Sequence, residues 1–211
     1  LLAGTPGGGP VTLFDATEDF PSRIACEVKA FDPSGVLEAK EIRRYDRFAQ
    51  FALVAAEEAM AHAGLLSGLP EAVSPARFGV VVASGIGGIT TFEEQCRNLI
   101  SKGPTRVSPF FIPMFIPDIA PGLISIRYGA QGPNYATVSA CASSAHAIGD
   151  AARLIERGDA DIMIARIIRI HFQRRLAAAQ HMQSLNHRSK FADVARPIVR
   201  FDHAHRRRVE T

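Results

Sequence analysis

The chain has few cysteines, and they follow no recognisable metal or disulfide pattern. Cys26, Cys96 and Cys141 lie far apart in 211 residues. Zinc sites and disulfide-rich domains use closely spaced or evenly paired cysteines. The first residues also lack the basic and apolar regions of a signal peptide. The sequence therefore predicts no metal site and no secreted framework, and it favours a reducing, cytoplasmic setting.

The sequence also lacks an apolar run that could cross a membrane. The nearest candidate, residues 109–126, carries one charge but has prolines at 109, 113, 117 and 121. Each interior proline would cost a helix about 3 kcal/mol. We therefore expect no membrane partner. We expect instead a buried loop that leads into a helix near Pro117, with Pro121 distorting that helix.

Glycine is absent from the last part of the chain. Residues 166–211 hold none of the 17 glycines and have 11 basic against 3 acidic residues, whereas residues 1–165 have 13 and 18. Translation of a GC-rich gene in another reading frame would give such a change. We therefore separate residues 1–165 from a divergent basic tail, 166–211, for which frame disruption is one hypothesis. Its arginines alone do not establish a nucleic-acid partner, and we expect none.

Apolar periodicity predicts helices and strands that alternate along the chain. Helical spacing shows as apolar positions three and four residues apart, and buried strands show as short continuous apolar runs. The predicted helices are 38–63, 90–101 and 141–157, and the predicted strands are 78–83, 135–140 and 161–165. Alternation of this kind indicates an α/β layered fold.

One cysteine, Cys141, stands where a predicted strand meets a predicted helix. The unpaired N–H groups and positive end of a helix favour a thiolate at this point. A thiolate is a nucleophile and can hold an acyl group as a thioester. The alternative is a small buried cysteine with no chemical role. His146 lies five residues further on, where a helix turns it away from the thiol, and we interpret it as structural.

A glycine-rich segment, residues 85–88, follows the predicted strand 78–83. It lacks the third glycine and the later acidic residue of a dinucleotide site. We interpret it as a tight turn that needs the positive φ of glycine.

The sequence around Cys141, residues 128–146, closely resembles the nucleophile segment of β-ketoacyl-[acyl-carrier-protein] synthases. These condensing enzymes belong to the thiolase superfamily, and the match is strongest to the elongating type II subclass. Further matching motifs are residues 20–25, 47–52, 83–88, 108–113 and 158–161. The resemblance covers roughly residues 1–165. It implies the N-terminal half of a thiolase-like, five-layer α-β-α fold. Residue 1 of this sequence would correspond to a position after the first strand and helix of that fold.

The resemblance also implies a function and its residues. It implies an acyltransferase of fatty-acid biosynthesis that needs no cofactor and works as a homodimer with an acidic acyl carrier protein. Cys141 would form the acyl thioester. Ile86 would gate the acyl pocket, while Phe111 and Ile112 would line the partner's pocket, and Lys40, Arg43, Arg44 and Arg106 would dock the carrier protein. None of the histidines stands in the family's two catalytic contexts, so the alternative is a truncated or frame-disrupted, non-catalytic fragment.

Overall fold

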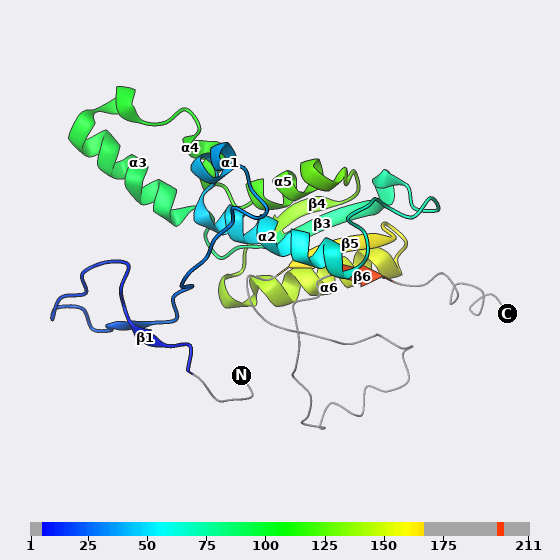
Figure 1. Cartoon of the computed structure of the whole chain (residues 1–211), viewed down its shortest axis with the longest axis horizontal. Helices are drawn as coiled ribbons and strands as arrows, with labels where there is room; N and C mark the ends of the chain where they lie inside the picture. Colours follow the sequence, from blue (N-terminus) through cyan, green and yellow to red (C-terminus); the bar gives the residue numbers. More distant parts are fainter. Residues whose placement is uncertain (1–5, 167–197, 201–211) are drawn as a thin grey trace. The chain divides into compact units, whose positions relative to one another are not determined.

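The computed structural model describes residues 6–166 and 198–200 (Figure 1). The chain divides into two compact units between Asp32 and Pro33. In the first unit, β1 (Gly9–Pro10) pairs with β2 (Ile24–Ala25) in antiparallel fashion. The Glu27 carboxylate accepts hydrogen bonds from the Thr12 hydroxyl and from the N–H groups of Thr12 and Leu13. The Thr12 hydroxyl bond is the main cause that lowers the pKa of Glu27.

The second unit is built on a four-stranded sheet. Its strands are β3 (Phe78–Ala83), β4 (Asn134–Thr137), β5 (Ile162–Arg166) and β6 (Ile198–Arg200), in the order β4-β3-β5-β6. The first three are parallel, and β6 runs antiparallel to β5. The strands near 78–83, 135–140 and 161–165 are thus confirmed. The sequence did not predict β6, and the rest of the tail lies outside the described residues.

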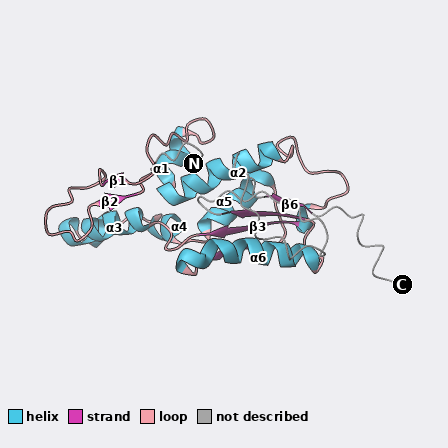
Figure 2. Ribbon diagram, turned by 90° about the horizontal axis from the view of Figure 1, so that it is seen from below, coloured by secondary structure: helices cyan, strands magenta, loops and turns pink. Residues whose placement is uncertain are grey.

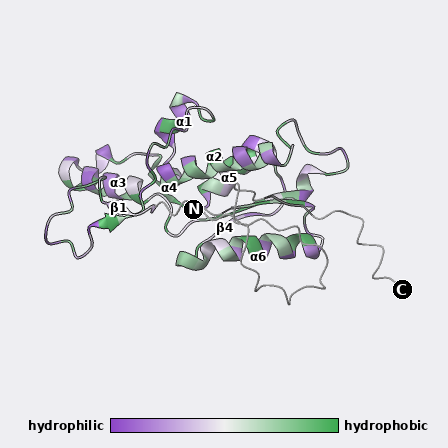
Figure 3. Ribbon diagram, turned by 60° about the horizontal axis from the view of Figure 1, so that its bottom comes forward, coloured by the Kyte–Doolittle hydropathy of each residue, from purple (hydrophilic) through white to green (hydrophobic). Residues whose placement is uncertain are grey.

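Helices cover both faces of this sheet (Figure 2). The helices of this unit are α1 (Ala39–Arg44), α2 (Arg47–His62), α3 (Ile89–Lys102), α4 (Phe111–Phe115), α5 (Ile119–Tyr128) and α6 (Ser143–Glu156). Three short 3₁₀ turns are η1 (Pro75–Arg77), η2 (Pro104–Arg106) and η3 (Ala140–Ala142). Helices α2 and α5 pack on one face and α6 on the other, which confirms the layered α-β-α architecture (Figure 3).

Strand β3 lies inside the sheet and is buried along its whole length. Its alternate residues Phe78, Val80 and Val82 join the apolar cluster of α2 and α5. Val81 and Ala83 point the other way and join the cluster of α6. Burying one such large apolar side chain contributes roughly 1.5–3 kcal/mol. The apolar run of β3 is therefore continuous because helices cover both faces of this strand.

The single helix predicted over residues 38–63 is wrong, because the chain turns between α1 and α2. Asp46 lies at this break and is 7% exposed. One carboxylate oxygen accepts from the N–H of Phe48, at 3.2 Å, and caps α2. The other accepts from the N–H and hydroxyl of Thr91 in α3, at 2.9 and 2.6 Å. Apolar spacing records the packed face of both helices but not the capped start between them.

Residues 109–126 form two helices: the predicted helix near Pro117 is confirmed, since α5 begins at Ile119, but the predicted buried loop before it is wrong, because that segment contains α4. No residue of α4 is buried. Pro121 is the third residue of α5, where a backbone N–H has no partner within the helix, so the proline fits without distortion. No helix among the described residues is both long and apolar enough to span a membrane.

An ion pair joins the starts of β3 and β5. The Arg77 guanidinium donates to both carboxylate oxygens of Asp161 and, at 2.9 Å, to the carbonyl of Gly158. The Asp161 N–H donates back to the Arg77 carbonyl at 2.8 Å. Gly158 has φ 80°, which confirms that it closes the helix before β5. The motif at 158–161 therefore stabilises the sheet through Gly158 and Asp161.

A second polar contact holds α2 to α5. The Tyr128 hydroxyl donates to the Glu57 carboxylate at 2.6 Å. Burial, followed by this hydrogen bond and the Glu57 charge, raises the pKa of Tyr128 well above its ordinary value. Folding therefore favours the neutral phenol.

This shift predicts a loss of stability in alkali. Above about pH 10 the unfolded tyrosine releases its proton while the folded one keeps it. The unfolded state then binds fewer protons, so the free energy of unfolding falls as pH rises, by at most about 1.4 kcal/mol per pH unit for one group. Urea unfolding of wild type and Tyr128→Phe between about pH 9 and 11.5 measures this. We expect a shallower decline in the variant; parallel curves would contradict the assignment.

Candidate active site

Two loops leave the sheet side by side at the carboxyl end of its strands. Ala83, the last residue of β3, is in register with Thr137, the last residue of β4. The next residue, Ser84, donates its N–H to the Thr137 carbonyl at 3.2 Å. Residues 84–88 and 138–142 therefore start from the same edge, with Ile86 in one loop and Cys141 in the other. In open α/β folds this edge is where ligands bind.

Cys141 lies in η3, a 3₁₀ turn that runs directly into α6. The helix therefore begins two residues later than predicted. The Cys141 side chain is exposed, which excludes the alternative of a buried structural cysteine. The preceding residue, Ala140, has φ 48°, a left-handed conformation that costs a residue with a Cβ roughly 1–2 kcal/mol. The nucleophile candidate thus follows a strained backbone position.

Hydrogen bonds of serine and threonine side chains surround this turn. The buried Ser143 hydroxyl accepts from the N–H of Ser139, at 2.7 Å, and donates to the carbonyl of Ala140, at 2.8 Å. The Thr137 hydroxyl donates to the Ser143 carbonyl at 2.8 Å. The Ser139 hydroxyl lies 2.6 Å from Nδ1 of His146. His146 therefore has a structural partner, as we interpreted it from the sequence.

The glycine-rich loop is a tight turn, as predicted. Gly87 has φ 90°, and its N–H donates to the Ser84 hydroxyl at 2.9 Å. A Cβ on Gly87 would lie 2.3 Å from the Phe115 carbonyl oxygen, and one on Gly88 would lie 2.4 Å from that of Met114. The loop is therefore packed against the end of α4. In the same loop, Ile86 is 60% exposed and lies beside the loop that carries Cys141.

Phe111 and Ile112 begin α4 on a partly exposed aromatic surface. The ring of Phe111 stacks on Phe115 and lies 6.1 Å from that of Phe92 in α3. Ile112 is 56% exposed. Packing therefore covers most of Phe111 and less than half of Ile112, and the pocket role of both residues stays a prediction.

The four basic residues predicted to dock a carrier protein are exposed. Lys40, Arg43 and Arg44 lie on the short α1 rather than on one long helix, and Lys40 pairs with Glu38 at 3.0 Å. The Arg44 guanidinium lies 4.9 Å from the ring centre of Phe110, just before α4. Arg106 ends η2 and lines a hollow of about 570 Å³ with Lys102 and Asn98. The C-terminal end of α3 thus carries positive charge from Lys102 and Arg106.

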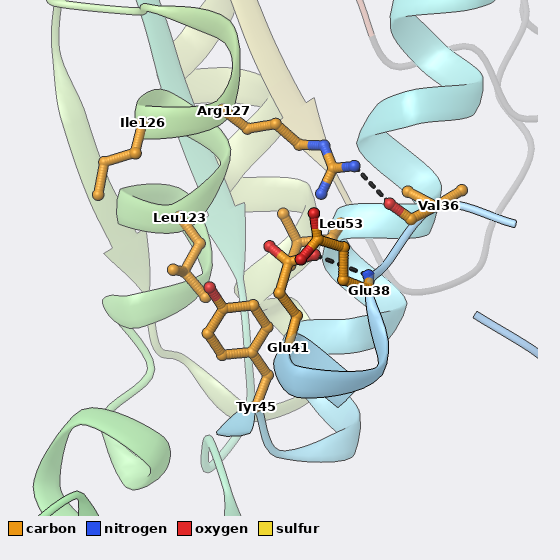
Figure 4. A pocket seen from close by; sticks show the side chains of 8 residues that line it. All are labelled: Val36, Glu38, Glu41, Tyr45, Leu53, Leu123, Ile126 and Arg127. Atoms are coloured by element: carbon orange, nitrogen blue, oxygen red, sulfur yellow. Dashed lines mark hydrogen bonds between the residues drawn. The ribbon is translucent and has the colours of Figure 1, made fainter. Parts of the chain in front are cut away.

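A separate hollow of about 320 Å³ lies between α1, α2 and α5 (Figure 4). Arg127 crosses it to donate to the Val36 carbonyl, and Glu41 accepts from the N–H of Glu38. These polar groups therefore already have partners within the chain. None of the predicted site residues lines this hollow. Its lining is Val36, Glu38, Glu41, Tyr45, Leu53, Leu123, Ile126 and Arg127.

No group of metal ligands accompanies Cys141. Among residues 6–166 and 198–200, no three His, Cys, Asp or Glu side chains are placed to hold a metal ion. All three cysteines are free.

Sequence reasoning missed Asp46 and Ser143. Asp46 directly precedes the helical run from residue 47, which is a usual capping signal. Ser143 lies in the segment that singled out Cys141, but its two-sided bonding depends on the left-handed turn at Ala140. Nothing in the sequence signals that turn, because alanine rarely adopts it.

Comparison with known proteins places these features in a family. The model of the β-ketoacyl synthase N-terminal domain matches residues 8–195. The 3-oxoacyl-[acyl-carrier-protein] synthase 2 of Coxiella burnetii is 47% identical over 165 residues, which cover 78% of this chain and 39% of that protein. The Staphylococcus aureus protein of the same name is 48% identical over 163 residues, covering 77% and 40%. The chain spans about two fifths of the length of these relatives.

Solved structures agree with the fold. A β-ketoacyl synthase from Burkholderia phymatum superimposes with a TM-score of 0.65 at 27% identity, over 77% of this chain and 40% of that one. A type II polyketide ketosynthase, solved with its acyl-carrier protein and bound to a hexaketide, gives 0.60 at 25% identity, over 65% and 39%. Together with the exposed cysteine that precedes α6, these matches show that the chain belongs to the β-ketoacyl synthase family and carries its N-terminal domain.

Proposed function

We propose that this chain is the nucleophile-bearing part of a β-ketoacyl-[acyl-carrier-protein] synthase of fatty-acid biosynthesis. The observation that carries the proposal is the place of Cys141. It is exposed, follows a left-handed residue and precedes a 14-residue helix at the carboxyl edge of the sheet. Its free thiol also supports the cytoplasmic setting that we propose for the enzyme.

The reaction would proceed through a thioester on Cys141. The thiolate attacks the acyl carbonyl carbon, and the thiol of the carrier protein leaves. A malonyl-carrier protein then loses CO₂, and its carbanion attacks the new thioester to give the β-ketoacyl product and free Cys141. The Cys141 N–H would supply one donor to the oxyanion. By resemblance, the second donor and two histidines belong to parts of the family fold outside the two fifths that this chain spans. No step requires a cofactor.

Ile86, Phe111 and Ile112 are the proposed acyl-pocket residues. Ile86 is supported by its exposure in the loop that shares the sheet edge with Cys141. Phe111 and Ile112 are supported by the partly exposed surface of α4, which would reach the pocket of a partner subunit.

The proposed partner is an acidic acyl carrier protein. Lys40, Arg43, Arg44 and Arg106 are exposed basic residues, and charge complementarity would speed and orient the encounter. The polyketide ketosynthase similar to this chain was solved in complex with its acyl-carrier protein, which supports docking as the role of this charge.

We also propose a homodimer formed through β4. This strand lies at the edge of the sheet within the described residues, and edge strands can pair with a second copy. One outward group is already occupied, because the Ala136 N–H donates to the Asp118 carboxylate at 2.9 Å. Pairing with a second copy would have to displace this carboxylate.

The alternative proposal is a truncated or frame-disrupted fragment without catalysis. It rests on the composition of residues 166–211, whereas the family match, which runs to residue 195, counts against it for residues 166–195. Resequencing the coding DNA across codons 160–211 decides this point. An in-frame read with natural codon usage would eliminate frame disruption.

Acylation of Cys141 is the direct test of the function. The 211-residue chain, treated with a cerulenin-like electrophile, should carry one adduct, mapped to Cys141 by peptide mass spectrometry. Prior incubation with acyl-loaded carrier protein should block this adduct, because the Cys141 sulfur is then held in a thioester. Cys26 is also exposed and serves as the internal reference. The Cys141→Ala variant should lose the adduct. Equal labelling of Cys26 and Cys141 would favour the alternative proposal of a fragment without catalysis. Without the histidines, we expect negligible condensation with malonyl-carrier protein.

Reversing one docking charge should weaken carrier binding. We expect Arg43→Glu to lower the affinity for acyl carrier protein about tenfold at low salt, mainly through slower association. The difference should shrink near 0.5 M salt because exposed charges are screened. Arg157→Glu is the matched control, since Arg157 is an exposed arginine at the far end of α6. Equal losses in both variants, measured by biolayer interferometry, would argue against a docking surface on α1.

Self-association should depend on the outer edge of β4. Light scattering over a concentration series should show dimers of the wild-type chain. Ala136→Pro removes an N–H that faces away from β3 and should shift the chain toward monomer. Circular dichroism checks that the variant is folded. A wild-type monomer at every concentration, or an equally dimeric variant, would contradict pairing through β4.

A further inference from the structure

We propose that Ser143 is a positioning residue that fixes the turn carrying Cys141. The proposal rests on the function proposed for Cys141 but goes beyond it, because it assigns a role to a side chain that would touch no substrate. Ser143 lies two residues after the thiol, at the first position of α6. It acts on the thiol only through the backbone between them.

Burial sets Ser143 apart from its neighbours. Ser143 is 2% exposed, whereas Cys141 and Ala142 on its N-terminal side are exposed. A buried hydroxyl without a partner would cost about 1–3 kcal/mol. Both bonding capacities of this one are used, since it accepts from the N–H of Ser139 and donates to the carbonyl of Ala140. The side chain therefore joins two consecutive backbone units that precede Cys141.

These two bonds span the strained residue. Ala140 has φ 48°, and its own carbonyl oxygen is the acceptor of the Ser143 hydroxyl. A left-handed alanine persists only where its surroundings hold it. Two hydrogen bonds of about 1 kcal/mol each are comparable with the cost of this conformation. Without the hydroxyl, the turn would relax toward negative φ and change where the next residue, Cys141, leaves the strand.

A second set of contacts holds Ser143 itself. The Thr137 hydroxyl donates to the Ser143 carbonyl, which ties the helix start to the last residue of β4. The Ser139 hydroxyl contacts Nδ1 of His146, one turn into α6. The strand end and the first turn of the helix are therefore linked on both sides of the cysteine. This arrangement keeps Cys141 next to the unpaired N–H groups of the helix start, which attract an anion.

Alkylation by iodoacetamide tests this role without requiring acyl transfer. In this reaction the Cys141 sulfur forms a bond to the CH₂ carbon and iodide leaves. Rates at Cys141 and Cys26 are measured in one sample of the full chain by timed quenching and peptide mass spectrometry. We expect Ser143→Ala to lower the alkylation rate of Cys141 about tenfold, while the alkylation rate of Cys26 changes less than about twofold. Ser143→Thr keeps the hydroxyl and should restore most of the Cys141 rate.

Ser144→Ala is the matched control, because the Ser144 hydroxyl makes no hydrogen bond among the described residues. It should leave both rates and the melting temperature near the wild-type values. An unchanged Cys141 rate in Ser143→Ala, an equal change at Cys26, or failure of threonine to rescue would each overturn the proposal. These outcomes are separate from the proposed function, which fails instead if wild-type Cys141 is not acylated by carrier-bound acyl groups.

Discussion

The burial of β3 on both faces is the constraint on which the rest of the second unit depends. A strand with apolar side chains on both sides needs a helical layer above and below it, and α2, α5 and α6 supply those layers. Parallel neighbours on both edges then require crossover helices. The crossover from β4 through α6 to β5 passes over β3, so β4 and β5 are joined within the sheet only through β3. The position of Cys141 at the start of α6 follows from this path.

The same constraint explains why the proposed site residues Ile86 and Cys141 lie at the same end of the strands. Parallel strands end together, so the loops that carry Ile86 and Cys141 start from adjacent residues. The opposite edge is closed by the ion pair of Arg77 and Asp161, which is structural. Polar side chains at the two edges thus have different tasks, although both lie in segments that resemble the same family. The family resemblance alone would not distinguish the polar side chains at one end of the strands from those at the other, whereas their hydrogen bonds do.

The sequence predicted the elements with strong periodicity and missed those set by single polar contacts. Strand β3, helix α3 and the strand–cysteine–helix order were predictable because apolar runs and spacing report burial. The break before α2 was not, since a buried carboxylate that bonds to α3 decides it. The start of α6 was placed two residues early because η3 depends on the left-handed Ala140. The place of Cys141 directly before a helix was predictable and its role stays a prediction, while Ser143 required the geometry of its bonds.

The glycine-rich loop limits how this family member can diversify. Gly87 and Gly88 press against the backbone at the end of α4, and Gly88 also lies against Asp46, which caps α2. A side chain at either position would displace α4 or the start of α2. Gly85 has open space around it, and Ile86 is largely exposed. Within this loop, variation at low cost to folding is therefore confined to Gly85 and Ile86, and under the proposed function these two positions would change before their neighbours when the acyl group changes.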